Sequence, residues 1–322
     1  MVDHQTLLHR LSEIGLTGKT INWFNSFLLN RSFQVNINNS LSELIPLETG
    51  VPQGSALSAT LFNIYILPLC QLLSSLSITY YRYADDIQLL IPVTNTIENV
   101  LKLAATHLNT ITNILNQMNL CLNMDKTECI LLERKSQLNE PKNSIQIDNT
   151  MIKLSENVNN LGIWLDPELS FKKHIAMKTK EGFYKLSILK RLKPLLNQPE
   201  FRTILQSLIF TTFDYCNSLL IGLPKSATRL LQLLQNATVR ILTNRKRSEH
   251  ITPVLKELHW LPIKKRIDYK LLSIIHKNIN NNESECLNTL LQKHIPQHNT
   301  RSANKALLTI PSVTTASLTT IR

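Results

Sequence analysis

Paired cysteines, an apolar leader and a long hydrophobic run are all missing from this sequence of 322 residues. The five cysteines are scattered without a C-x-x-C pair, which favours a reducing compartment over a disulfide framework. Residues 3–5 (DHQ) are polar where a secretory signal has its apolar core. The apolar stretch 61–73 is interrupted by Asn63 and Pro68 and is too short to span a bilayer. We therefore expect a soluble intracellular protein, nuclear or cytoplasmic, that makes no membrane contact.

Negative charge is scarce over most of the chain. The formal net charge is +12, and the isoelectric point is near 9.5. Residues 1–100 hold 4 Lys/Arg and 7 Asp/Glu (net −3), whereas the remaining residues hold 31 and 16 (net +15). The basic part favours a polyanionic partner, and it is separate in sequence from the most acidic motif.

That motif lies in residues 78–93, ITYYRYADDIQLLIPV. Two β-branched and aromatic runs, 78–83 and 87–93, flank Ala84, Asp85 and Asp86, which predicts a hairpin with two carboxylates at its tip. Adjacent side chains at a turn can approach one point, so both carboxylates could bind a hard divalent cation. The alternative is that Asp-Asp is simply favourable turn chemistry.

A second motif, residues 50–55 (GVPQGS), precedes a predicted helix over Leu57–Leu73. Together, GVPQGSALSATLFNIYI and YRYADDIQLL resemble the reverse transcriptase domain of LINE-type (non-LTR) retrotransposons, because several motifs agree in order and spacing. The resemblance implies template-directed nucleotidyl transfer by two Mg²⁺ ions about 3.5–4 Å apart. It also implies an RNA template, a DNA primer and deoxynucleotides as partners.

In that family, the first aspartate of the Y-x-D-D turn binds both metals and the second assists; these positions are Asp85 and Asp86. The third metal ligand belongs to motif A, of which this chain matches only the trailing Val-Asp-His, at residues 2–4. Asp3 then corresponds to an aspartate that the family does not use for metal. We therefore expect motif A and the fingers to lie upstream of residue 1, and the isolated chain to lack measurable polymerase activity.

Four further residues acquire roles from the resemblance. Gln53 and Gly54 match the segment that in the family contacts template and incoming nucleotide. The alternative is that they form an ordinary loop before a helix. Tyr83 matches the aromatic residue before the catalytic turn, or it packs on the strand. Lys126, in a segment that resembles motif D, would protonate the leaving pyrophosphate; otherwise it is one surface lysine among many.

The downstream half supplies candidate nucleic-acid contacts. Leu161 and Gly162 resemble the primer grip, although core packing explains the apolar residues there equally well. A basic segment follows, which suits phosphate-backbone contacts to a primer–template duplex but could also be a solvated helix face. Its candidate backbone contacts are Lys172, Lys173, Lys178, Lys180, Lys190 and Arg191.

A second basic cluster includes Arg240, Arg245, Lys246 and Arg247. The neighbouring strings at residues 213–226 and 250–270 also resemble the region downstream of the polymerase in vertebrate-type LINE elements. Asp214 lies within residues 213–226, and its helical context favours a role in packing and capping over a catalytic role.

The periodicity predicts an α+β half followed by helices. Helices are expected over residues 3–14, 20–29, 57–73 and 97–118, and strands over 33–37, 44–47, 128–132, 144–147, 151–154 and 161–165. The fold class is thus a partial polymerase palm, an antiparallel sheet with helices, followed by an all-helical thumb and a C-terminal helical region. The expected domains are 1–168 (palm), 169–296 (thumb and basic helical region) and 297–322 (weakly ordered tail).

Two function classes follow. The chain is either a reverse transcriptase domain that works with the missing segments, or a catalytically dead, nucleic-acid-binding remnant of a retrotransposon. A repurposed interaction protein has no positive feature in its favour.

Overall fold

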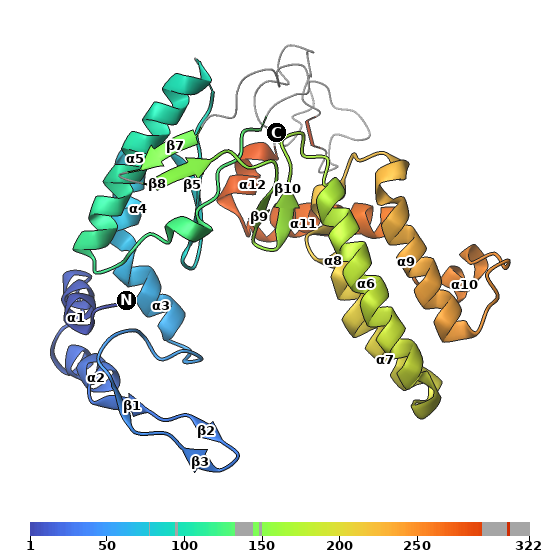
Figure 1. Cartoon of the computed structure of the whole chain (residues 1–322), viewed down its shortest axis with the longest axis horizontal. Helices are drawn as coiled ribbons and strands as arrows, with labels where there is room; N and C mark the ends of the chain where they lie inside the picture. The colour runs from blue at the N-terminus through green and yellow to red at the C-terminus, as the bar shows by residue number, and fades with distance from the viewer. Residues whose placement is uncertain (77, 94–95, 133–143, 148–149, 292–307, 310–322) are drawn as a thin grey trace, which may run out of the picture. The chain divides into compact units, whose positions relative to one another are not determined.

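The computed structural model describes residues 1–76, 78–93, 96–132, 144–147, 150–291 and 308–309. The chain divides into two compact units, Met1–Val158 and Asn159–Arg322, shown in Figure 1. The predicted α+β half followed by helices is confirmed. The domain border after residue 168 stays a prediction, and the tail 297–322 lies outside the described residues except for 308–309.

The first unit combines helices with short antiparallel hairpins. Its helices are α1 (His4–Glu13), α2 (Gly18–Leu28), α3 (Ser58–Tyr65), α4 (Leu67–Ser75) and α5 (Ile97–Gln117). Its strands are β1 (Arg31–Phe33), β2 (Asn36–Ile37), β3 (Ser40–Leu41), β4 (Ile45–Leu47), β5 (Thr79–Tyr83), β6 (Asp86–Leu90), β7 (Ser144–Ile147) and β8 (Thr150–Lys153). Over the described residues these strands form separate pairs, β1–β4, β2–β3, β5–β6 and β7–β8, rather than one continuous sheet.

The single helix predicted over Leu57–Leu73 is two helices. α3 and α4 meet at Ile66 with a bend of 43°. Pro68 stands in the first turn of α4, where its missing N–H costs nothing but where it cannot continue a preceding helix. No single helix in the described part of the chain is long and apolar enough to cross a membrane, and the bent α3–α4 pair meets that criterion only by length and composition.

The core of the first unit gathers around α1, α3 and α4. Leu7, Leu61 and Leu69 are fully buried there, and β5 and β6 pack against the same cluster through Tyr80 and Leu89. Burial of side chains of this size contributes about 1.5–3 kcal/mol each. The acidic hairpin therefore rests on a packed base.

A fully buried tyrosine crosslinks this core. The Tyr65 hydroxyl donates to the Met118 carbonyl and accepts a hydrogen bond from the Asp3 backbone N–H at 3.2 Å. The Asp3 carboxylate accepts bonds from the backbone N–H and hydroxyl of Thr6, both at 2.7 Å, and thereby caps α1. The side-chain bond from Thr6 holds the pKa of Asp3 below its ordinary value. Asp3 thus has a structural partner already.

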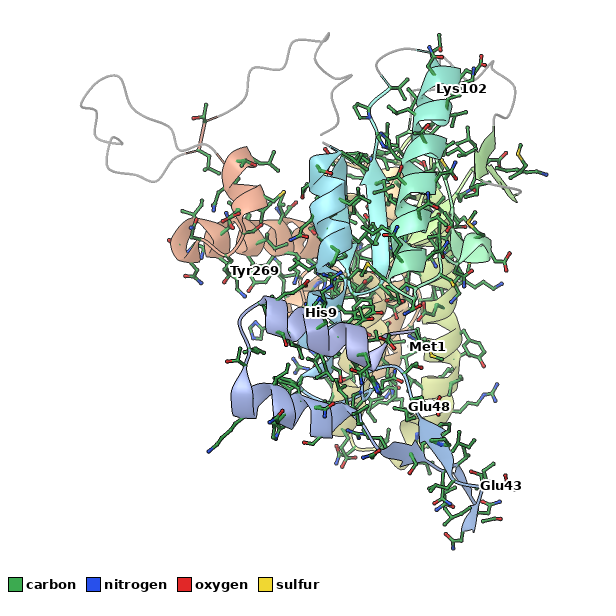
Figure 2. The ribbon with its side chains drawn as sticks, turned by 90° about the vertical axis from the view of Figure 1, so that its left-hand side faces the viewer. Met1, His9, Glu43, Glu48, Lys102 and Tyr269 are labelled. Atoms are coloured by element: carbon green, nitrogen blue, oxygen red, sulfur yellow. The ribbon has the colours of Figure 1, made fainter. Side chains whose placement is uncertain are left out.

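An exposed arm extends from the end of α2. It consists of the β1–β4 and β2–β3 pairs, and Figure 2 shows it with Glu43 near its end. Phe33, Ile37, Leu41 and Leu44 are all exposed on it. The predicted strands 33–37 and 44–47 are therefore present in part, but neither face of the arm is covered within the first unit.

The predicted strand over residues 128–132 is wrong. Cys129 forms one isolated parallel bridge to Leu154, and its carbonyl accepts the Ser155 N–H at 2.8 Å. The neighbouring β8 instead pairs along its length with β7, with Ile152 opposite Ile145. The buried Ile145 and Ile152 pack against α5, so the hydrophobic contact favours the β7–β8 pairing.

The second unit begins with a hairpin and is otherwise helical. The paired strands are β9 (Val158–Asn160) and β10 (Ile163–Leu165). The longer helices are α6 (Lys172–Leu192), α7 (Gln198–Leu205), α9 (Lys225–Thr243) and α11 (Ile263–Asn281), with shorter α8 (Thr211–Asp214), α10 (Thr252–Glu257) and α12 (Glu285–Leu290). α6 and α9 pack closely at Gly182, where a Cβ atom would lie 2.3 Å from Leu234 Cδ2.

One ion pair joins distant segments of this unit. Arg266 donates two hydrogen bonds to Asp214, from Nε at 2.7 Å and from Nη2, and its guanidinium lies 4.6 Å from the Phe210 ring centroid. Asn217 also donates to Asp214 at 3.3 Å. Asp214 therefore anchors packing, as its sequence context favoured.

A buried histidine predicts that the second unit loses stability in acid. His174 on α6 is buried, and its Nδ1 has no hydrogen-bond partner among the described residues. Burial lowers the pKa of His174 from its ordinary 6.5, and the charge of Lys178 adds to this. The unfolded chain therefore binds more protons below pH 6.5, so this contribution to stability is complete above that pH and is lost as the pH falls.

We expect His174→Leu to reduce the loss of unfolding free energy between pH 8 and pH 5, measured by urea denaturation. His276→Gln, at an exposed position on α11, is the control and should retain the wild-type loss. Equal pH dependence of the wild type and His174→Leu would contradict this assignment.

Candidate active site

The acidic hairpin forms as predicted, with one difference in detail. β5 and β6 pair from Thr79 opposite Leu90 to Tyr83 opposite Asp86. Ala84 and Asp85 alone make the loop, so Asp86 is the first residue of a strand rather than part of the turn. Asp86 and Tyr83 are cross-strand neighbours whose side chains share one face, because directly opposed residues of an antiparallel pair point the same way.

Both carboxylates of the hairpin are exposed. Within the described part of the chain, neither has a hydrogen-bond or ion-pair partner. Tyr83 beside them is 68% exposed, so it does not contribute to the core. The tip of the hairpin therefore presents two adjacent anionic groups and an aromatic ring to solvent.

Backbone strain and an arginine define the shape of the turn. Ala84 has φ +53°, a left-handed conformation that costs a residue with a Cβ about 1–2 kcal/mol. Arg82 Nη1 donates to the Ala84 carbonyl at 3.2 Å and to Asn63 Oδ1 on α3 at 2.9 Å. This Arg82 latch ties the acidic turn to the helix that follows the GVPQGS loop.

The GVPQGS loop is itself held from both ends. The Gly50 N–H donates to the Val2 carbonyl at 2.7 Å, and the Gly50 carbonyl lies 2.8 Å from His4 Nε2. At the other end, the Ser58 hydroxyl donates to the Pro52 carbonyl. Between these anchors Gln53 and Gly54 are exposed, and Gly54 has φ +87° with open space where a Cβ would stand. A ligand strand could approach the backbone closely there.

Lys126 closes a short helical turn, Met124–Lys126, that Asn123 caps through its side chain at 3.2 Å from the Lys126 N–H. Its side chain is exposed and has no partner among the described residues. The ammonium group is thus available to a ligand, and its role as a proton donor stays a prediction.

The donor set at the hairpin fits a hard divalent cation in part. Mg²⁺ in phosphate-transfer sites is commonly held by one or two carboxylates, with waters and substrate phosphates as the other ligands. Asp85 and Asp86 supply two carboxylates. No group of three or more His, Cys, Asp or Glu that could hold a metal ion occurs among the described residues.

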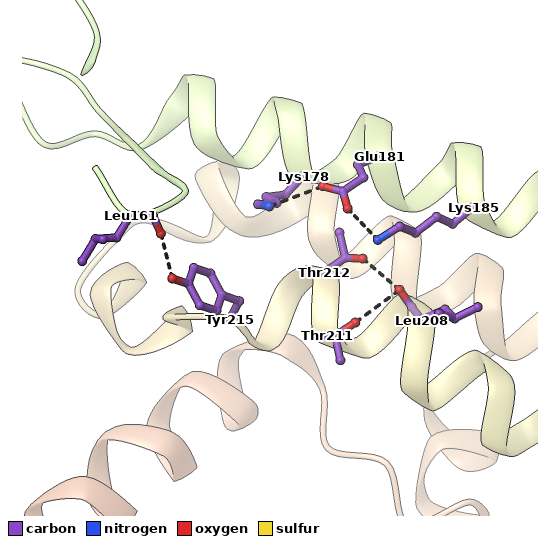
Figure 3. Close-up of polar contacts among 8 residues, drawn as sticks. All are labelled: Leu161, Lys178, Glu181, Lys185, Leu208, Thr211, Thr212 and Tyr215. Atoms are coloured by element: carbon purple, nitrogen blue, oxygen red, sulfur yellow. Dashed lines mark hydrogen bonds and ion pairs between the residues drawn. The ribbon is translucent and has the colours of Figure 1, made fainter. Parts of the chain in front are cut away.

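The predicted primer grip is a tight turn held by a tyrosine. Leu161 and Gly162 form the two-residue loop between β9 and β10, and both have positive φ, at +47° and +82°. Figure 3 shows the Tyr215 hydroxyl donating to the Leu161 carbonyl at 2.7 Å. Tyr215 Cε1 would lie 3.7 Å from a Cβ added at Gly162. The turn is therefore braced, and its contact with a primer stays a prediction.

The structure divides the six predicted backbone-contact residues into two groups. Lys178 and its neighbour Lys185 both bind Glu181, at 3.3 and 2.6 Å, as Figure 3 shows. The bond from Lys185 lowers the pKa of Glu181 below its ordinary value, so the carboxylate stays ionised. Lys173 Nζ lies 3.7 Å from the ring centroid of Trp164. The remaining four are exposed and have no partner among the described residues: Lys172, Lys180, Lys190 and Arg191.

The exposed face of α6 also carries large apolar side chains. Met177, Phe183, Tyr184 and Ile188 are each at least 40% exposed. Helical spacing places Tyr184 in line with Lys180 and Arg191. This mixed basic and aromatic surface is what remains after the opposite side of α6 packs into the core of the second unit.

Three residues of this arrangement were missed in the sequence. Arg82 and Asn63 are 19 positions apart, and Tyr215 is 54 positions from Leu161. No local pattern connects such pairs. For Arg82, the one available signal was a positive charge three positions before Asp85 in the acidic turn.

Comparison with known proteins identifies the family of the first unit. The family model described as reverse transcriptase (RNA-dependent DNA polymerase) matches residues 1–165. The chain therefore belongs to the reverse transcriptase family. It is also similar to a probable RNA-directed DNA polymerase from transposon BS of Drosophila melanogaster, with 26% identity over 264 residues. That match covers 76% of this chain but 28% of the relative, so the chain spans less than a third of the relative's length.

Proposed function

We propose that this chain is a retrotransposon reverse transcriptase domain that, as part of a longer polypeptide, extends a DNA primer on an RNA template. The observation that carries the proposal is the pair of exposed, unpartnered carboxylates at the tip of the β5–β6 hairpin. The match of residues 1–165 to the reverse transcriptase family supports it. The named transposon origin of the Drosophila melanogaster relative supports the retrotransposon context.

Asp85 and Asp86 would hold the divalent cation, which when bound supplies Lewis-acid stabilisation of the transferred phosphoryl group. Gln53 and Gly54 would contact the template and the incoming nucleotide, with Tyr83 beside the carboxylates. Lys126 would donate a proton to the leaving pyrophosphate. Leu161 and Gly162 would contact the primer, and the exposed basic residues of α6 would contact the backbone of the duplex.

Manganese provides the direct test of the carboxylate pair. Mn²⁺ accepts the same oxygen ligands as Mg²⁺, and its unpaired electrons broaden NMR signals of nearby nuclei. We expect Mn²⁺ to broaden the backbone amide signals of residues 83–87 at substoichiometric concentration. Asp85→Asn should remove most of this broadening, because only one carboxylate then remains.

Glu43→Gln is the matched control, since it removes an exposed carboxylate from the arm of the same unit. It should leave the broadening at residues 83–87 unchanged. Broadening centred elsewhere in the chain would contradict the assignment of the metal site to Asp85 and Asp86. Broadening at residues 83–87 that persists in an Asp85→Asn, Asp86→Asn double variant would contradict it as well.

The second candidate is a catalytically dead, nucleic-acid-binding remnant. It is favoured by the finding that the described residues offer no group of three metal ligands. Both candidates predict cation binding at the hairpin and duplex binding at α6. They differ in whether a longer polypeptide of the parent element restores primer extension.

A further inference from the structure

The second unit contains a pocket that the proposed function does not use. It lies between α9, α10 and the loop 244–251, and its volume is about 390 Å³. Its walls include Asn236, Arg240, Arg247 and His250. Pockets of this size lie at the lower end of those that hold small ligands.

One face of α9 supplies the floor of the pocket. Gln232, Asn236 and Arg240 follow one another at intervals of four residues, which places them on one side of the helix. Gln232 Nε2 donates to Asn236 Oδ1 at 2.9 Å, and Gln232 Oε1 accepts the Ile263 N–H at 3.0 Å. The Asn236 oxygen is thus occupied, while its NH₂ group has no acceptor among the described residues.

Arg240 is incompletely bonded. Its Nε is shielded from solvent and has no hydrogen-bond partner among the described residues, and Nη2 makes one long contact of 3.4 Å to the Glu249 carbonyl. A shielded donor without an acceptor costs about 1–3 kcal/mol, more for a charged group. Nη1 has no hydrogen-bond partner among the described residues and is not shielded in this way, so Nη1 is the donor that an anionic ligand in the pocket would reach.

The one acidic side chain of the pocket wall is already engaged. Glu249 accepts a hydrogen bond from the Lys246 N–H at 2.7 Å and forms an ion pair with Arg245 at 2.8 Å. These contacts lower the pKa of Glu249, the Lys246 bond most strongly. Its charge is therefore balanced mainly by Arg245, and the charge of Arg240 also lowers its pKa. Neither Arg240 nor the exposed Arg247 forms an ion pair with a carboxylate among the described residues.

We propose that this pocket binds the phosphate group of a nucleotide, either free or within a nucleic-acid strand. Two guanidinium groups can grip phosphate oxygens through paired N–H donors, and the Asn236 amide adds a neutral donor. The volume beyond the phosphate accommodates part of the attached nucleoside. The site is built from the second unit alone, so it stands independently of the carboxylate hairpin.

Arginine footprinting on the full chain tests the proposal residue by residue. The chain is treated with phenylglyoxal alone or with inorganic phosphate, adenosine 5′-monophosphate or a 12-nucleotide RNA without terminal phosphates. Peptide mass spectrometry then gives the modification rate of each arginine. We expect at least a fivefold slower modification of Arg247 with adenosine 5′-monophosphate or with the RNA, and no change at Arg229, an exposed arginine of α9 outside the pocket.

The ligands distinguish the source of the phosphate. Protection by adenosine 5′-monophosphate, but not by the RNA, assigns a free nucleotide, whereas protection by the RNA assigns a strand. Protection by inorganic phosphate alone overturns the proposal, because the pocket then does not accept a nucleotide. Arg247→Gln should weaken binding of the protecting ligand about tenfold, since a charge-assisted hydrogen bond is lost. Arg229→Gln removes the same charge and should bind normally. Protection of Arg247 no greater than that of Arg229 with all three ligands overturns the proposal.

Discussion

Primer extension by the polypeptide of residues 1–322 on a primed RNA template is expected not to rise measurably above the background of the assay. Nucleotidyl transfer by two metal ions needs carboxylates that fix both ions and their spacing. The described residues offer Asp85 and Asp86 at one hairpin and no group of three ligands. Loss of metal stabilisation worth about 4 kcal/mol slows the reaction about 10³-fold. The measurement is incorporation of labelled deoxynucleotide with Mg²⁺ and then with Mn²⁺.

Cooperative urea unfolding of the same preparation is the control, because it shows that the polypeptide is folded. Extension above background that Asp85→Asn abolishes would contradict the predicted inactivity while supporting the assignment of the hairpin. Extension that survives in Asp85→Asn would contradict both.

Removal of four charges from α6 is expected to weaken duplex binding strongly and to reduce its salt dependence. The variant replaces Lys172, Lys180, Lys190 and Arg191 by Gln, the positions that are exposed and unpartnered among the described residues. Each lost phosphate contact lowers the slope of log K against log salt by about 0.9. Between 50 and 200 mM salt, the wild-type affinity should therefore fall by about 10²-fold more than that of the variant. Fluorescence anisotropy of a labelled primer–template duplex measures both slopes.

The matched control is Lys178→Gln with Lys185→Gln, two residues of the same helix whose ammonium groups bind Glu181. Removing both lysines should change the slope by less than one such contact per residue, because Glu181 already balances part of their charge. Binding should also be nearly independent of sequence, since backbone contacts do not read bases. Equal slopes of log K against log salt for the wild type and the four-residue variant would show that the duplex does not bind at these four residues of α6.

The acidic hairpin could be predicted because its signal is local. β-branched and aromatic residues on both sides of Ala84 and Asp85 predict paired strands, and β5 and β6 follow that pattern. The position of Asp86 within β6 could not be predicted. It depends on a two-residue loop with Ala84 at positive φ, where propensity favours glycine or asparagine.

In other parts of the chain, prediction from the sequence is limited by contacts between residues that are far apart in the sequence. The prediction of a strand over residues 128–132 was wrong because β8 pairs with β7 instead. The β7–β8 pairing depends on the burial of Ile145 and Ile152 against α5. The nucleic-acid contact of Lys173 stays a prediction, and the position of Lys173 over Trp164 could not be predicted because it depends on how β10 meets α6. In contrast, the pairing of Glu181 with Lys178 and Lys185 has helical spacings of three and four and could have been inferred from the sequence.

The Arg82 latch has a mechanical consequence. One guanidinium nitrogen holds both the Ala84 carbonyl and Asn63, so the acidic tip cannot swing outward unless α3 travels with it or a bond breaks. The loop that carries Gln53 leads directly into α3 and is fastened to it through Ser58. A displacement of that loop would therefore be transmitted through α3 and Arg82 to Asp85 and Asp86.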